Sequence, residues 1–428
     1  MLLVCLADMP YGYYTLVSGG RAWAAKGADN VQNTTDERPY QHYSQWMTYS
    51  EMARVPYSYL LDFSQRPKWS YVMGIELEAM LDTYLHYGDQ RILDYLQMYV
   101  DKMIDDDGVI TGYKLSDYNL DNVRTGHFLA RMYQMKPDRK VFLAMQTLMA
   151  QLSAQPRTEA DGVYWHKAIY SYQVWLDGIF MGLPFRVLTA KLTLPTDSAT
   201  LIYDDAVHQV SVTYDRTLDP ETGLNRHAWD ETHDMFWADK HTGLSRHCWG
   251  RAQGWYTMAL IELLDALPAD YKGRETIIEI LRKDLSAVVG WQDKDSGLWY
   301  QVMDSPMREG NYLEATCSAM FAYSLLKAHR LGYVDDTFGT AGRRAYEGIL
   351  NRFVSRDGEL MSLTHCCSVA GLGPGLSEKV IAAAPNVKED KRRDGSFEYY
   401  ISEPVRANDA KGVGPFIWAS LEMENLSK

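Results

Sequence analysis

Asp177 is the carboxylate that the sequence places best for acid–base chemistry. It lies in the stretch QVWLDGIFMGLPF, between an apolar tripeptide and an apolar helix, and next to Trp175. Burial at the mouth of such a helix raises the pKa of a carboxyl group toward neutrality, as a general acid requires. A second interpretation is equally open at this point, because an aspartate here is also typical of a helix cap.

Asp121, in YNLDNVRTG, has a similar place one helical hairpin earlier. Two carboxylates at equivalent places can face each other, and such pairing raises the pKa of one of them. Capping is again the alternative for Asp121. His166, in YWHK, and His227, in NRHAWDE, lie in loops beside tryptophans and are candidates for the same site.

A cation lies between two indoles in WGRAQGW. Arg251 is a permanent positive charge with a planar donor fork, and Trp249 and Trp255 flank it. Gly250 and Gly254 either bring the backbone close to another part of the molecule or permit unusual dihedral angles. This combination favours a site for a small anion that carries a carbon ring.

The elements that must position these residues are helices in pairs. Apolar residues recur at helical spacing, and each pair is joined by a turn, as at Gly88–Asp89 and Lys136–Asp138. The expected pairs fall within residues 68–104, 122–152, 173–218, 250–293 and 311–354, and a last helix at 411–428 pairs with one at 46–54. About six hairpins closed on themselves predict an all-α fold, an (α/α)6 barrel.

If the first helices of the hairpins run parallel, the loops before them all open at one end of the barrel. Loops that converge on one end are where such a fold places its site. Residues 297–304, GLWYQVMD, are expected to be a short β-ribbon or a loop, and residues 370–404 a surface excursion near the C-terminus. We expect residues 41–428 to be one catalytic barrel, and residues 1–40 to be an N-terminal extension of uncertain structure.

Composition excludes several function classes. A net charge of −13 argues against binding of a nucleic-acid backbone, and no apolar run is long enough to span a membrane. Five cysteines without CxxC spacing predict no zinc site, and Cys366–Cys367 reads as two thiols. We find no HExxH, GxSxG, P-loop or GxGxxG motif, so we expect neither a metal nor another cofactor. The start MLLVCLA fits a truncated export signal, which would mean a periplasmic or secreted protein, and otherwise a cytoplasmic one.

Several uncommon motifs occur together and in one order. They are RPKWSY, VWLDG, WGRxxGW, GLWYQV followed by NYLEA, and YYISEP followed by GVGPF. The chain, from about Trp46 to Glu424, resembles glycoside hydrolase family 105, the unsaturated rhamnogalacturonyl and related unsaturated glucuronyl hydrolases. The resemblance implies the same barrel, and a small acidic oligosaccharide that ends in a 4,5-unsaturated uronate, with pectin rhamnogalacturonan as the expected source.

The resemblance also implies residue roles. Asp177 matches the general acid, which protonates C4 of the double bond and helps to deliver water to C5. Asp121 matches the second active-site aspartate, and Arg251 is expected at the sugar carboxylate. The positions that match the pocket wall are His166, His227, Trp249 and Trp255, with Tyr71 and Trp175 beside them.

Three stretches depart from the family pattern, and two other functions stay open. Ala252–Gln253 differ from the usual residues, residues 374–392 form a longer stretch than usual, and the first forty residues have no counterpart. A sugar epimerase or isomerase on the same barrel would rely on paired histidines on late inner helices, which the sequence lacks. A non-catalytic carbohydrate-binding barrel is disfavoured because both Asp121 and Asp177 are present.

Overall fold

Helical hairpins follow one another along residues 39–373 and 393–427, the parts of the chain that the computed structural model describes. In each of the first five, a buried helix is followed by a more exposed one. These pairs are α2 (Tyr71–Tyr87) with α3 (Gln90–Met103), α4 (Thr125–Met135) with α5 (Arg139–Ala154), α6 (Leu176–Thr193) with α7 (Thr196–Thr217), α8 (Gly250–Ala266) with α9 (Arg274–Gly290), and α10 (Ala315–Arg330) with α11 (Asp336–Arg352).

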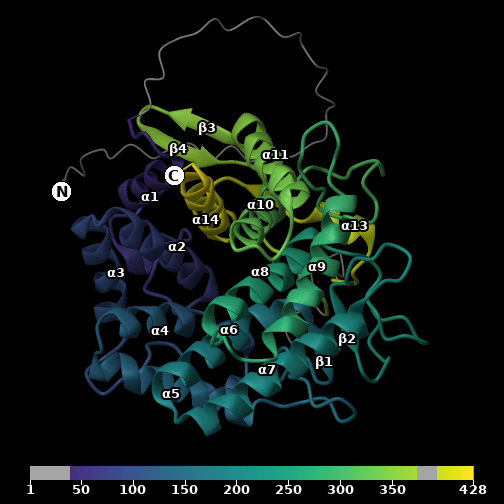
Figure 1. The fold of residues 1–428 in the computed structure, drawn as a ribbon, viewed down its shortest axis with the longest axis horizontal. Coiled ribbons are helices and arrows are strands. Elements are labelled where there is room, and N and C mark those ends of the chain that lie inside the picture. Colours follow the sequence, from purple (N-terminus) through teal and green to yellow (C-terminus); the bar gives the residue numbers. More distant parts are fainter. Residues whose placement is uncertain (1–38, 374–392, 428) are drawn as a thin grey trace, which may run out of the picture. The chain divides into compact units, whose positions relative to one another are not determined.

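The buried helices close into a ring (Figure 1). Each contacts the next, from α2 through α4, α6, α8 and α10, and α14 (Ala410–Leu426) packs between α10 and α2. The outer partner of α14 is α1 (Tyr43–Arg54), which packs against it from the other end of the chain. The predicted (α/α)6 barrel is confirmed, and so is the pairing of its last helix with residues near Trp46.

The two kinds of helix differ in apolar pattern as their positions require. Almost every residue of α8 is buried, because this helix is surrounded by its neighbours in the ring. By contrast, α3 buries one stripe, at Ile92, Tyr95, Leu96, Tyr99, Val100 and Met103. The turn between α2 and α3 has the predicted residues: Gly88 adopts a left-handed φ of 73°, and Asp89 caps α3 by accepting from the Arg91 amide.

Gly250 and Gly254 set the distance between α8 and α10. A Cβ atom would lie 2.8 Å from the Cys317 sulfur at Gly250, and 2.6 Å from the Met320 sulfur at Gly254. Both contacts are closer than side chains allow, so the predicted close approach of backbone is confirmed, with α10 as the neighbour.

The strands are short additions to the helical ring. Antiparallel pairs join β1 (Gln173–Trp175) to β2 (Ala228–Asp230), β3 (Val354–Asp357) to β4 (Leu360–Leu363), and β5 (Cys366–Cys367) to β6 (Val405–Arg406). Residues 297–304, expected to be a short β-ribbon or a loop, do not form a pair of strands. That segment makes isolated bridges, Tyr300 with Leu313 and Val302 with Trp249, because it runs against two different loops.

Short helices complete the described chain. They are η1 (Ser58–Leu60), η2 (Leu115–Asp117), η3 (Leu120–Asn122) and α13 (Phe397–Ser402). The predicted N-terminal extension and most of the expected excursion, residues 374–392, lie outside the described residues. Within the described parts, no helix has the length and apolarity needed to cross a bilayer. Cys248, Cys317, Cys366 and Cys367 are free thiols, as predicted for the vicinal pair.

Candidate active site

The inner helices begin at one end of the ring, and the predicted site residues meet there. Tyr71, the first residue of α2, lies within electrostatic reach of Asp121, Asp177 and Asp409, which come before or at the starts of α4, α6 and α14. Burial, with these three carboxylates, raises the pKa of Tyr71 above its ordinary value, against the opposing charge of Arg251 on α8. The convergence of these loops is therefore confirmed.

Asp177 lies in the first turn of α6, close to one histidine. Its Oδ2 atom is 3.3 Å from Nε2 of His227, and 13% of its side chain remains exposed. Trp175, not Asp177, is the residue that precedes the helix, and no side chain there caps it. The capping alternative is thus wrong, and the carboxylate is left for other contacts.

The pKa expected for Asp177 needs a correction. Burial does raise it, as predicted, but the interactions of the carboxylate with His227 and His166 outweigh burial. The pKa of Asp177 consequently lies below its usual value, and the side chain is ionised in the free protein. The pattern of apolar residues revealed the burial but not the histidines that oppose it.

Asp121 also has a histidine partner, together with a lysine. It lies in η3, its Oδ2 atom is 2.6 Å from the Lys167 ammonium group, and its Oδ1 atom is 3.4 Å from Nε2 of His166. Asn119 caps this short helix, so Asp121 is not its cap. The two carboxylates have separate histidine partners, and the pKa rise expected from their mutual pairing is not found at Asp177.

His166 is buried and stacked on an indole. Its ring lies 4.6 Å from that of Trp175, nearly parallel to it. Burial lowers the pKa of His166 to about 4, although Asp121 and Asp177 favour its charged form. His166 is therefore neutral near pH 7, and its Nδ1 atom has no hydrogen-bond partner among the described residues.

Arg251 is almost completely buried, at 2% exposure. It donates a hydrogen bond to the carbonyl of Cys367, and its guanidinium group lies 4.7 Å from the centre of the Trp249 ring. Trp249 donates from Nε1 to Gln301 over 3.1 Å. A guanidinium group has five donors, so one carbonyl leaves others for a ligand.

Trp255 lies deeper in the ring. It stacks on Phe180 at 4.8 Å and meets the edge of Tyr71 at 6.5 Å. Trp249 and Trp255 are each 1% exposed. That they present their ring faces to a sugar stays a prediction.

Three residues of this site have no role in the sequence argument. Lys167 follows His166 directly and pairs with Asp121, so its position beside a candidate histidine was an available signal. Tyr400 contacts His227 from 173 positions away, and Gln301 contacts both Trp249 and the Tyr400 carbonyl. No local spacing could have placed Tyr400 or Gln301 there.

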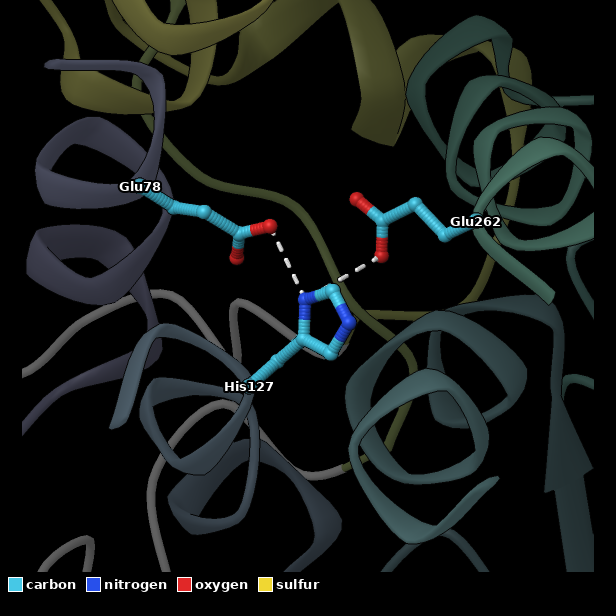
Figure 2. Close-up of side chains that lie close together, drawn as sticks. All are labelled: Glu78, His127 and Glu262. Carbon is cyan, nitrogen blue, oxygen red and sulfur yellow. Dashed lines mark hydrogen bonds and ion pairs between the residues drawn. The ribbon is translucent and has the colours of Figure 1, made fainter. Parts of the chain in front are cut away.

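A second polar cluster lies between the inner helices α2, α4 and α8. Figure 2 shows Glu78, His127 and Glu262, whose ligand atoms lie within 4.8 Å of one another and could surround a cation. Arg124 already pairs with both carboxylates, at 2.8 Å from Glu78 and in contact with Glu262. His127 lies 2.9 Å from Glu78 through Nδ1. With Arg124 in place, each carboxylate already has a cationic partner, and the arrangement does not fit a further cation.

A cavity of about 230 Å³ opens beside this network. It is lined by residues from later parts of the inner helices, among them Arg131, Lys191 and Lys327. The six helices therefore run in the same direction, with the candidate active site at one end and this cavity toward the other.

Comparison with known proteins assigns the class and then the family. A model of Glycosyl Hydrolase Family 88 matches residues 43–427, which makes the protein a glycosidase. A solved family 105 glycoside hydrolase from C. acetobutylicum ATCC 824 is 38% identical, with a TM-score of 0.81 over 90% of this chain and 100% of that chain. The chain therefore belongs to the glycoside hydrolases of families 88 and 105, as its motifs indicated.

Two curated relatives are similar over part of the chain. Protein Atu3128 from Agrobacterium fabrum is 37% identical over 253 residues, 58% of this chain and 100% of that protein. The unsaturated rhamnogalacturonyl hydrolase YesR from Bacillus subtilis is 27% identical over 281 residues, 64% of this chain and 74% of that protein.

Proposed function

We propose that this glycosidase removes a 4,5-unsaturated uronic acid from the non-reducing end of oligosaccharides released by polysaccharide lyases, and that rhamnogalacturonan fragments are its main substrates. The observation that carries the proposal is the pair of partly exposed carboxylates, each beside a histidine, at the end of a barrel of families 88 and 105. The name of the relative YesR supports rhamnogalacturonan as the source.

The reaction begins with hydration of the C4=C5 double bond. Asp177 delivers a proton to C4, and a water molecule adds its oxygen to C5 while losing a proton to a neighbouring base. The resulting C5 hemiketal opens by breaking its bond to the ring oxygen, and C1 then releases the next sugar as an alcohol. Asp121, held by Lys167 and His166, orients the sugar in this scheme.

Substrate binding supplies the proton donor that the free protein lacks. Asp177 is ionised before the sugar arrives, because His227 and His166 lower its pKa. An anionic uronate beside it adds negative charge and excludes water, and both effects raise the pKa of a carboxyl group. Arg251 would pair with the sugar carboxylate through a charge-assisted contact, while its guanidinium group stays packed over the Trp249 ring.

Ultraviolet absorbance tests the proposal directly. The conjugated C4=C5 bond and carboxylate absorb, and hydration removes this chromophore. We would follow absorbance with unsaturated disaccharides made by lyases from rhamnogalacturonan, ulvan and glucuronan. Loss with the rhamnogalacturonan product supports the full proposal, and loss with another source alone changes the substrate class. Stoichiometric binding without loss would instead favour a carbohydrate-binding barrel.

A further inference from the structure

His227 stands between a catalytic carboxylate and a phenol. Its Nε2 atom is 3.3 Å from Oδ2 of Asp177, and its Nδ1 atom is 2.7 Å from the hydroxyl oxygen of Tyr400. His227 and Tyr400 are both completely buried. We propose that Tyr400 is a positioning residue of the reaction, which fixes the tautomer of His227 so that the hydrogen on Nε2 faces Asp177.

The surroundings of Tyr400 hold its hydroxyl group in one place. The ring stacks on Trp249 at 5.9 Å with an 18° angle between the planes. Gln301 donates from Nε2 to the Tyr400 carbonyl over 3.2 Å, and the same side chain accepts from Trp249. Tyr400 therefore has little freedom to turn away from His227.

The tautomer follows from counting hydrogens. A neutral imidazole carries one N–H, and its other nitrogen accepts. Burial raises the pKa of the Tyr400 phenol well above its ordinary value, so the hydroxyl group keeps its hydrogen. Among the described residues Nδ1 of His227 is the one hydrogen-bond partner of this hydroxyl group, so we infer that the hydrogen is donated there. When Tyr400 donates to Nδ1, the hydrogen of the imidazole must lie on Nε2.

The atoms between His227 and Asp177 agree with this assignment of the His227 tautomer. Nε2 of His227 and Oδ2 of Asp177 lie 3.3 Å apart, and neither atom has a well-aligned hydrogen-bond partner among the described residues. An Nε2 hydrogen stabilises the carboxylate form of Asp177, whereas a lone pair in its place would repel that form. The kinetic part of this inference rests on the proposed function, because it concerns the proton that Asp177 gives to the sugar.

Other titratable groups surround Asp177, His227 and Tyr400. Near Asp177 and His227 they are His166 and Tyr71, and near Tyr400 they are Tyr399, Asp304 and Cys248. Tyr400→Phe removes one oxygen and keeps the stacked ring and each of these neighbours. Tyr399→Phe is the matched control, because the hydroxyl group of Tyr399 accepts from the Gly371 amide and has no contact with His227.

Kinetics of the full-length enzyme give the first test. For Tyr400→Phe we expect kcat to fall about tenfold with little change in KM. The alkaline limb of its pH profile should move up by about one pH unit, because Asp177 loses a donor that favours its carboxylate. Tyr399→Phe should change neither kcat nor the position of the alkaline limb. The proposal would be overturned if the pH profile of Tyr400→Phe superimposed on that of the wild type. A fall in kcat without a shift of the alkaline limb would overturn it as well.

Nuclear magnetic resonance of 15N-labelled histidine gives the second test, and it needs no substrate. The signals of His227 are those that disappear in His227→Gln. In the wild type we expect a protonated Nε2 and an unprotonated Nδ1, and in Tyr400→Phe a mixed or reversed pattern. The opposite tautomer in the wild type would refute the proposal even if the enzyme is active. If instead no unsaturated sugar is hydrated, the proposed function fails while this spectrum still decides the tautomer.

Discussion

At the scale of single residues, the proposed mechanism depends most on Asp177. Asp177→Asn keeps the shape of the side chain but cannot donate a proton to C4, so kcat should fall about a thousandfold. Binding of the unsaturated disaccharide should persist, measured by calorimetry. Asp284→Asn is a suitable control, because Asp284 is also buried but contacts Thr257 and Gln253 away from the site. Near-normal turnover by Asp177→Asn would show that another group is the acid.

A substitution at Arg251 can separate the effect of its positive charge from that of its planar hydrogen-bonding group. Arg251→Lys keeps one positive charge but loses the planar fork. We expect KM for the unsaturated disaccharide to rise at least about tenfold, because a charge-assisted hydrogen bond is lost. Steady-state kinetics on the acid and on its neutral amide provide the comparison. If the wild-type enzyme handles both equally well, Arg251 does not bind the carboxylate.

Asp284 also makes a prediction about stability. Burial raises its pKa to about 7, although bonds from Thr257 and Gln253 oppose the rise. The unfolded chain releases this proton near pH 3.8 and the folded chain near pH 7, so the wild type loses stability as pH rises between these values. Asp284→Asn should escape that loss and gain up to about 4 kcal/mol relative to the wild type. Urea unfolding at pH 4.5 and pH 8 measures the difference. An equal difference at the two pH values would contradict the prediction.

The residue types were largely readable from the sequence, whereas their pKa values were not. The apolar residues around Asp177 correctly indicated its burial, and VWLDG and YWHK indicated candidates that do lie at one end of the barrel. The sign of the pKa shift depended on His227, fifty positions later in the chain and brought close by the ring of helices. Tyr400 is more distant still, so only the folded structure could reveal it.

At the scale of elements, the Arg124 network joins α2, α4 and α8. Arg124 is fully buried, and so are its partners Glu78 and Glu262. Arg124→Met leaves two buried carboxylates without their cation and should cost about 3–5 kcal/mol. Adding Glu262→Gln to it should recover part of this loss. Thermal unfolding gives the measurement, with Arg282→Met as a control, because its pair with Glu275 is exposed. A loss in the control as large as in Arg124→Met would rule out a special role for the network.

Elements were predictable to the extent that they are local. Helical periodicity and turns such as Gly88–Asp89 depend on a few neighbouring residues, and those hairpins were predicted well. The segment 297–304 has the alternating pattern of a strand, but the loops beside it supply bridges rather than a full strand partner. Strand pairing is a long-range property, and for this reason the sequence left open whether this segment is a ribbon or a loop.

At the scale of the whole molecule, the barrel is closed by joining α14 to α1 and α2. Residues from Pro39 onward form one compact unit. A chain that begins at Pro39 should therefore keep the melting temperature within about 2 °C and the kcat of the full-length protein. A chain that also lacks α14 should not fold, since α2 and α10 would lose their shared neighbour. Calorimetry and the absorbance assay test both chains, and a loss of stability in the first would place residues 1–38 in the folded unit.

The parallel direction of the inner helices also gives the barrel an electrical polarity. Each α-helix carries roughly half a positive charge at its N-terminus and half a negative charge at its C-terminus. Six N-termini at the active-site end therefore add a positive potential on a chain whose net charge is −13. At the other end, Lys191 and Lys327 lie in the last turns of α6 and α10, where their charges complement the negative dipole ends. Under the proposed function, the backbone would thus draw an anionic sugar toward one end of an acidic protein, in addition to the attraction proposed for Arg251.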